Sequence, residues 1–409
     1  MTTHLLNRLR WLLLLACLDG TTCIAQNQEP IVLVHGIAGW GREESPLLYW
    51  GGGSPGTEGD IEHMLKRQGF NVHTAAVGPY SSNWDRAVEL YYQIAGGCVD
   101  YGLKHKNENH HDRYDNAKCY PGFYKEWGAN HKIHLIAHSQ GGQTVRLLAA
   151  LLQQGNPEQL DKDSDLKNLF HGGRENWIHI ITTISTPNNG STLADMQKLI
   201  PELSLTLAAF RQFSNLDIFS ENYLKLGQWP HNRESGLTLS SYLTKVFANG
   251  PHDFSVYDLS KEGAQEFNQH DALNQNIHYF SIATQATTYH GFNWLGLGVD
   301  CWNEAMQPIL RPLSELINLC PAPAFLGAQE WLANDGVINT ISMKAPAGQP
   351  SQDFSYDQPS RPGVWQYLGV KAGWDHLHVV GMDFELSPRW SHSEVNAFYF
   401  NHAKFLSGL

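Results

Sequence analysis

The chain has 409 residues and is acidic, because 40 aspartates and glutamates outnumber 28 lysines and arginines and give a formal net charge of −12. This charge argues against a protein that binds nucleic acid or an anionic membrane electrostatically. Transient attachment to a neutral lipid or polymer surface through apolar area stays open.

The amino-terminal segment has the pattern of a secretory signal peptide. Arginines precede an apolar run at residues 11–18, which is too short to span a membrane, and Ala25 ends a suitable cleavage site. We therefore predict a signal peptide over residues 1–25 and a secreted protein, with no integral membrane segment after cleavage. Processing at Cys17 as a lipoprotein, or retention in the periplasm, is the alternative.

Residues 30–34 are predicted to form a buried strand that continues into the loop His35-Gly36-Ile37. About a hundred residues later, the apolar run at residues 133–138 meets the turn Ser139-Gln140-Gly141, and helix-like apolar spacing follows to residue 150. A strand, a small-x-Ser-x-Gly turn and a helix in this order form the nucleophile elbow of an α/β-hydrolase.

The elbow predicts that Ser139 is a nucleophile, with its hydroxyl held out over the end of a sheet. A helix-capping serine is the less favoured alternative. In this fold the loop after the first strand supplies one oxyanion-hole amide, and the residue after the nucleophile supplies the other. These donors would be the backbone N–H groups of Ile37 and Gln140.

A serine nucleophile requires a base and an orienting acid, which follow it in the order Asp, His in this fold. We assign His376 as the base, because it lies between polar loop residues and an apolar run. We assign Asp335, in an Asn-Asp-Gly turn, as the acid. Asp375 and Asp195, the latter in a predicted helix, are the alternative acids.

Several motifs in the same order resemble the secreted bacterial true lipases of family I.5, the thermophilic Bacillus-type and staphylococcal lipases. They run from about residue 30 to 385 and include residues 35–44, 77–87, 96–102, 137–144, 257–260, 334–336, 363–365 and 375–377. The resemblance implies a triacylglycerol lipase or carboxylic ester hydrolase without an organic cofactor. It also implies an α/β-hydrolase fold, with a mostly parallel sheet flanked by helices, a small zinc-holding extra domain and a helical lid.

In domain terms, we expect one α/β-hydrolase domain over residues 26–409, with insertions at about 80–125 for zinc and about 190–250 for the lid. The amphipathic stretches at residues 192–219, interrupted by Pro201, fit a lid whose apolar underside covers Ser139. An ordinary core helix is the alternative for this periodicity.

The resemblance implies a structural zinc held by two aspartates and two histidines. The matching positions are Asp85, His105, His111 and Asp253, with His110 as an alternative to its neighbour. Two neutral imidazoles and two carboxylates complete a tetrahedral zinc site with no open position. Without the resemblance, these histidines would be interpreted as part of a solvated loop.

Calcium is doubtful. Family members bind it partly through a glutamate two residues after the catalytic histidine, where this chain has His378. The later aspartate persists as Asp383, but the segment around Gly298 aligns poorly. A lost carboxylate removes both charge and a ligand, so we predict weak or absent calcium binding.

Four cysteines remain after cleavage, and four cysteines allow three pairings. An oxidising compartment favours disulfides. Proximity in sequence suggests Cys98–Cys119 and Cys301–Cys320, the first of which would close the loop that carries His105 and His111.

The sequence therefore predicts acyl transfer on an ester of a lipid. A polyester hydrolase (polyhydroxyalkanoate or aromatic polyester) with the same triad is an alternative, as is a phospholipase or acyltransferase. A non-catalytic lipid-binding protein on a hydrolase scaffold is disfavoured, because all three triad residues are present. The sequence does not specify the oligomeric state.

Overall fold

The computed structural model describes residues 27–44, 48–199, 225–229, 252–292, 298–319, 329–384 and 391–409. The predicted signal peptide and most of the predicted lid segment lie outside these residues. Within them, no helix combines the length and apolar character needed to cross a membrane.

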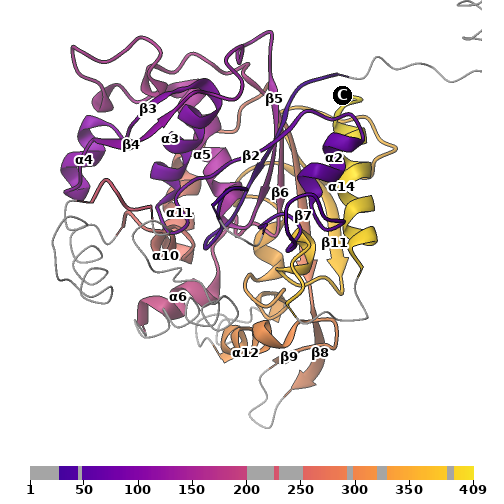
Figure 1. The fold of residues 1–409 in the computed structure, drawn as a ribbon. Coiled ribbons are helices and arrows are strands. Elements are labelled where there is room, and N and C mark those ends of the chain that lie inside the picture. The colour runs from indigo at the N-terminus through magenta and orange to yellow at the C-terminus, as the bar shows by residue number, and fades with distance from the viewer. Residues whose placement is uncertain are drawn as a thin grey trace, which may run out of the picture.

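A seven-stranded parallel sheet forms the centre of the fold (Figure 1), as expected for an α/β-hydrolase. Its middle strands are almost entirely buried apolar runs, which is typical of a parallel sheet covered on both faces. In spatial order the strands are β10 (Ser351–Asp353), β11 (Trp365–Ala372), β7 (His278–Gln285), β6 (Ile178–Ile184), β5 (Ile133–His138), β1 (Ile31–Val34) and β2 (Val72–Thr74).

Helices cover both faces of this sheet (Figure 1). On one face lie α3 (Asn83–Ala95) and α5 (Gln140–Gln154), and on the other lie α2 (Ile61–Arg67) and α14 (His392–Leu406). Alternate residues of β1 serve the two faces: Val32 and Val34 join the core under α3 and α5, whereas Ile31 and Leu33 join the core under α2 and α14.

A small hairpin unit follows α3. It consists of β3 (Gly97–Asp100), α4 (Leu103–Asn109) and β4 (Tyr114–Tyr120), and its two strands pair antiparallel. Cys98 and Cys119 lie opposite each other and form a disulfide, so this predicted pair is confirmed. The other predicted pair, Cys301–Cys320, is wrong in this structure, because Cys301 is a free cysteine; Cys320 lies outside the described residues.

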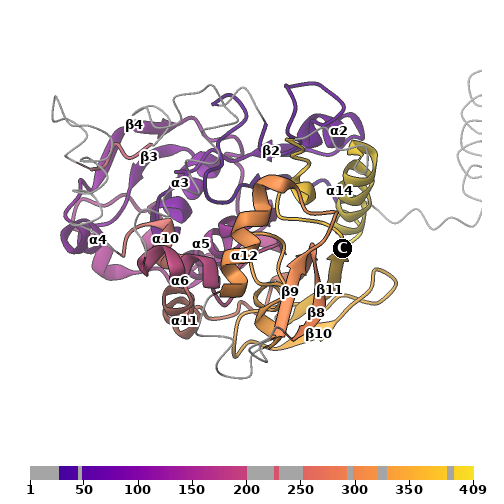
Figure 2. The same ribbon diagram turned by 90° about the horizontal axis from the view of Figure 1, so that it is seen from below.

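The remaining helices and the second hairpin lie toward the carboxyl edge of the sheet, seen from below in Figure 2. This region contains α6 (Thr192–Leu199), α10 (Ser255–Asp258), α11 (Lys261–His270), α12 (Arg311–Leu319) and the antiparallel strands β8 (Thr287–Phe292) and β9 (Gly298–Trp302). Short 3-10 helices connect elements throughout the fold: η1 (Pro157–Gln159), η2 (Leu169–His171), η5 (Pro308–Leu310), η6 (Gln329–Trp331), η7 (Thr340–Met343) and η8 (His378–Val380).

Removing the disulfide should destabilise the protein. The bond joins residues 21 positions apart, and a loop of this length corresponds to about 3 kcal/mol of lost stabilisation in chain-entropy terms. We expect a Cys98→Ser/Cys119→Ser variant to unfold at lower urea concentration. Cys301→Ser, which removes a free thiol, is the control and should match the wild type. Equal urea midpoints for all three proteins would contradict the expectation.

Candidate active site

Ser139 occupies a strained turn between β5 and α5. Its backbone has φ 56° and ψ −131°, a region that non-glycine residues rarely adopt, and its amide donates to the carbonyl of Ile184. Neighbouring backbone approaches closely, since a Cβ built on Gly141 would lie 2.4 Å from the Val34 carbonyl oxygen. These features are those of the predicted elbow, and they leave the serine hydroxyl at the carboxyl edge of the sheet.

The structure brings Ser139, His376 and Asp335 together in one hydrogen-bonded chain. His376 Nε2 lies 3.0 Å from Ser139 Oγ, and His376 Nδ1 lies 2.7 Å from Asp335 Oδ2. A carboxylate only accepts, so the proton of the neutral imidazole is on Nδ1 and Nε2 faces the serine with a lone pair. This is the arrangement in which a histidine can take the serine proton.

The carboxylate of Asp335 is buried but well supplied with donors. Its Oδ2 also accepts from the Thr284 hydroxyl at 2.7 Å, and its Oδ1 accepts from the amides of Val337 and Ile338 at 3.1 and 2.8 Å. Hydrogen bonds of this kind offset the desolvation of a buried carboxylate. These hydrogen bonds hold the Asp335 carboxylate in place beside His376 Nδ1.

Neither alternative acid has this position. Asp375 accepts from the amides of Gln307, Leu377 and His378, and burial raises its pKa. Asp195, on α6, accepts from the amide of Lys261. Each of these two carboxylates thus accepts hydrogen bonds from backbone amides.

The loop after β1 packs directly against the serine. A Cβ built on Gly36 would lie 2.5 Å from the Cβ of Ser139, so no side chain fits there. Within the described part of the chain, the amides of Ile37 and Gln140 form no hydrogen bond, whereas the adjacent Ala38 amide donates to Pro79. These two amides remain available as oxyanion donors.

Two residues that the sequence analysis missed hold this loop. The buried guanidinium of Arg86 donates to the carbonyls of His35 and Gly78 and to the Thr144 hydroxyl. The hydroxyl of Tyr49 accepts from the Gly36 amide at 2.9 Å and lies 2.6 Å from His138 Nδ1. Arg86 is part of a motif that the resemblance identified, but nothing in the sequence pointed to its target.

His138, directly before the serine, lies against the imidazole of His376, with ring centroids 4.5 Å apart. Burial and the nearby His376 lower the pKa of His138 well below its ordinary value. His138 is therefore neutral at pH 7, and its Nδ1 can accept a hydrogen bond from the Tyr49 hydroxyl. A positive charge that forms on His376 meets no second cation at this contact.

The four predicted zinc ligands also come together. Asp85 lies on α3, His105 on α4, and His111 and Asp253 on the segments that follow α4 and precede α10; their ligand atoms all lie within 4.8 Å of one another. His105 Nε2 is 3.2 Å from both Asp85 Oδ1 and Asp253 Oδ1, and His111 Nε2 is 3.3 Å from Asp253 Oδ2. Tetrahedral bonds of about 2.0–2.1 Å place ligand atoms roughly 3.3 Å apart.

The chemistry of this cluster fits a cation. His111 Nε2 and both oxygens of Asp253 are buried and have no hydrogen-bond partner in the described part of the chain, as expected for atoms that point at a shared ion. His111 Nδ1 lies 2.8 Å from the Asp112 carbonyl, which leaves Nε2 free to ligate. Burial opposes a charge on His105, yet Asp253 and Asp85 together raise its pKa to about 10. His110, in contrast, is exposed at the end of α4.

The chain is similar to known proteins in both sequence and structure. A family model described as "Lipase-like, C-terminal domain" matches residues 27–407. This chain belongs to that family. Lipase 2 of Staphylococcus aureus is 34% identical over 377 residues, which are 88% of this chain and 51% of the relative. The chain spans about half the length of the curated relatives it matches.

Two solved structures are similar to this chain over most of its length. EstA from Clostridium botulinum is 37% identical with a TM-score of 0.80, covering 96% of this chain and 90% of its own. The Staphylococcus hyicus lipase is 31% identical with a TM-score of 0.78, covering 95% of this chain and 97% of its own. The predicted resemblance to staphylococcal lipases is confirmed.

The segment predicted to form a lid is described only in part. Within it, α6 and residues 225–229 are described. Residues 225–229 contact the cluster of predicted zinc ligands. Gln228 Nε2 donates to Asp85 Oδ2 at 2.7 Å, and the buried indole of Trp229 lies 5.1 Å from the His111 ring. The middle of the predicted lid insertion is thus tied to the cluster.

At the predicted calcium position, His378 replaces a carboxylate ligand and its Nδ1 lies 3.4 Å from Asp375 Oδ2. Gly298 begins β9, and Asp383 follows η8 and is partly buried. In the described part of the chain, Asp383 belongs to no group of side chains that could hold a metal ion. Weak or absent calcium binding stays a prediction.

Changing one ligand tests the zinc site. We expect Asp85→Asn to lose one zinc equivalent and to melt at lower temperature, because the amide removes a negative charge from a fully buried site. Metal analysis of the purified protein and thermal unfolding measure both effects. His110→Asn, which changes the exposed neighbouring histidine, should keep its zinc. Unchanged zinc content and melting temperature in Asp85→Asn would rule the site out.

Proposed function

We propose that the chain hydrolyses carboxylic esters of lipids as a secreted triacylglycerol lipase or carboxylesterase. The observation that carries this proposal is the hydrogen-bonded chain from Ser139 through His376 to Asp335, beside two amides that have no hydrogen-bond partner among the described residues. Membership of the lipase-like family and relatives named lipases support it.

In the proposed mechanism, His376 Nε2 takes the proton of Ser139 as Oγ attacks the ester carbonyl. Asp335 keeps the imidazole in the required tautomer and stabilises the imidazolium. The amides of Ile37 and Gln140 stabilise the oxyanion of the tetrahedral intermediate. His376 then protonates the leaving alcohol, and water repeats the sequence to release the acid from Ser139.

Residues around the triad support these steps by position. Arg86 fixes the carbonyls that flank the oxyanion loop, and Tyr49 fixes the Gly36 amide. The neutral His138 packs against His376 without adding charge. Zinc at Asp85, His105, His111 and Asp253 would fill all four positions with protein ligands, so its part is structural: it joins α3, α4 and the segment before α10.

We also propose that residues of about 190–250 form a lid and that residues of about 80–125 form the metal-holding insertion of one domain over residues 26–409. Support for the lid comes from α6, which begins at Thr192, shortly after the end of β6, and the last residue of β6, Ile184, accepts from the Ser139 amide. A lid that opens at an interface would favour acyl chains over charged substrates.

Hydrolysis of an ester series tests the proposal. We expect p-nitrophenyl esters and emulsified triacylglycerol to be cleaved, with rates that rise with acyl length and at the emulsion surface. Ser139→Ala should lower turnover by several orders of magnitude, on the order of 10⁶ as in other serine hydrolases. Activity confined to short soluble esters or to polyesters would favour the polyester hydrolase. No Ser139-dependent hydrolysis would overturn the function.

A second variant tests the oxyanion loop. We expect Gly36→Ala to lower kcat by about 100-fold or more, as for a lost oxyanion donor, because its Cβ would force the loop or Ser139 to move. Gly128→Ala is the matched control, since a Cβ there would meet only the Glu126 carbonyl at 3.7 Å. Steady-state kinetics at equal thermal stability give the comparison, and equal kcat in both variants would exclude the role assigned to the loop.

A further inference from the structure

Histidines also gather at the amino edge of the sheet, away from Ser139. His134, His179 and His278 stand at or next to the first residues of β5, β6 and β7, and Glu29 lies two residues before β1. These strands are neighbours and parallel, so the side chains meet at one edge. Ser139 follows the other end of β5, roughly 16 Å away for five residues of extended chain.

We propose that Glu29, His134 and His179 bind a divalent transition-metal ion, with zinc as the ion that fits them best. Their ligand atoms lie within 4.8 Å of one another. Glu29 Oε2 is 2.6 Å from His179 Nδ1 and 3.5 Å from His134 Nε2. This site shares no residue with the cluster at Asp85 and plays no part in ester hydrolysis.

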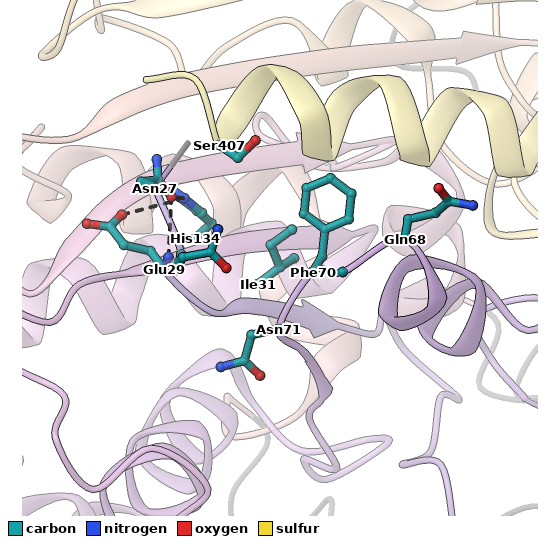
Figure 3. Close-up of a pocket in the computed structure, with 10 residues that line it drawn as sticks. Asn27, Glu29, Ile31, Gln68, Phe70, Asn71, His134 and Ser407 are labelled. Carbon is teal, nitrogen blue, oxygen red and sulfur yellow. Dashed lines mark hydrogen bonds and ion pairs between the residues drawn. The ribbon is translucent and has the colours of Figure 1, made fainter. Parts of the chain in front are cut away.

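The cluster adjoins a small cavity. The space, of about 30 Å³, is lined by Asn27, Glu29 and His134 among others, and Figure 3 shows these three side chains pointing toward one another. A volume of this size holds a water molecule or a single ion. The amide oxygen of Asn27 lies 3.0 Å from His134 Nε2 and is placed to act as a fourth ligand or to hold a metal-bound water.

The donor set has the chemistry of a zinc site. Two imidazoles and a carboxylate are common zinc ligands, and three protein ligands leave one position for Asn27 or water. His134 Nε2 and His179 Nδ1 both face the Glu29 carboxylate, so the two imidazoles and the carboxylate present their ligand atoms to one place. An entering ion would separate Glu29 from His179, which the partial exposure of both side chains allows.

A metal ion bound here would cross-link segments of the chain that are far apart in sequence. Asn27 already donates to the carbonyls of Leu406 and Ser407, at the end of α14, and His134 donates its amide to Pro30. An ion shared by Glu29, His134 and His179 would therefore join the segment before β1 to β5 and β6, at the place where the two ends of the described chain meet.

Zinc stoichiometry decides the proposal. Metal-stripped protein is equilibrated with Zn²⁺, passed through a desalting column and analysed for metal. We expect two equivalents in the wild type and one in Glu29→Gln/His179→Gln. His278→Gln is the matched control, because this histidine shares the edge but bonds to Ser360, and it should keep two equivalents. The same zinc content in the double variant and the wild type would overturn the proposal.

A milder change guards against misfolding. Glu29→Gln alone keeps the side-chain size and an oxygen that accepts from His179, so circular dichroism should match the wild type. In competition with a chromophoric chelator, its second zinc equivalent should bind at least tenfold more weakly than in the wild type. An unchanged second affinity in this variant would likewise overturn the proposal.

Discussion

The geometry of the candidate site depends on the strained turn at Ser139. Positive φ at a residue with a side chain is unfavourable, and it persists only where surrounding contacts over-determine it. Here Gly141 and Gly36 let the backbone of β1 and its loop come within contact distance of the turn. The strained conformation therefore depends on the sheet, because these close approaches occur only while β1 and β5 keep their register.

A second constraint is the burial of charge around that turn. Arg86 is fully buried, and its donors go to backbone carbonyls and a hydroxyl of the loops around the serine. Leaving such a cation without these partners would cost several kcal/mol, so the loops and the arginine hold each other in one arrangement. In the same way, the buried carboxylate of Asp335 accepts from two amides of its own turn, and the carboxylate and the turn hold each other in place. The site is thus preorganised by buried polar groups that are hydrogen-bonded to its loops.

How far the sequence predicts this site depends on how local each signal is. The elbow is local, since strand, turn and helix are contiguous, and it pointed directly to Ser139. Asp335 and His376 lie about 200 residues further on and required the known order of the fold. Arg86, Tyr49 and Thr284 were missed because their partners are distant in sequence, and nothing about an arginine or tyrosine indicates which carbonyl or hydroxyl it will meet.

The cysteines show the same limit. Cys98 and Cys119 face each other because a hairpin brings them into register, so proximity in sequence gave the right pair. The same rule failed for Cys301, which lies on β9, whose antiparallel partner is β8. The predicted zinc ligands are up to 168 positions apart, from Asp85 to Asp253, and only the family resemblance connected them.

The first turn of α3 links the metal cluster to the chemistry at Ser139. Asp85 is a predicted metal ligand, and the next residue, Arg86, donates to the carbonyls of His35 and Gly78 beside the proposed oxyanion loop. Both residues lie in the first turn of one helix, so a backbone shift of this turn would displace the guanidinium together with the Asp85 carboxylate. Gln228 adds the predicted lid to this connection through its bond to Asp85. A metal ion without any part in the proposed acyl transfer would thus still help to fix the loop that we propose receives the oxyanion, because one helical turn carries both Asp85 and Arg86.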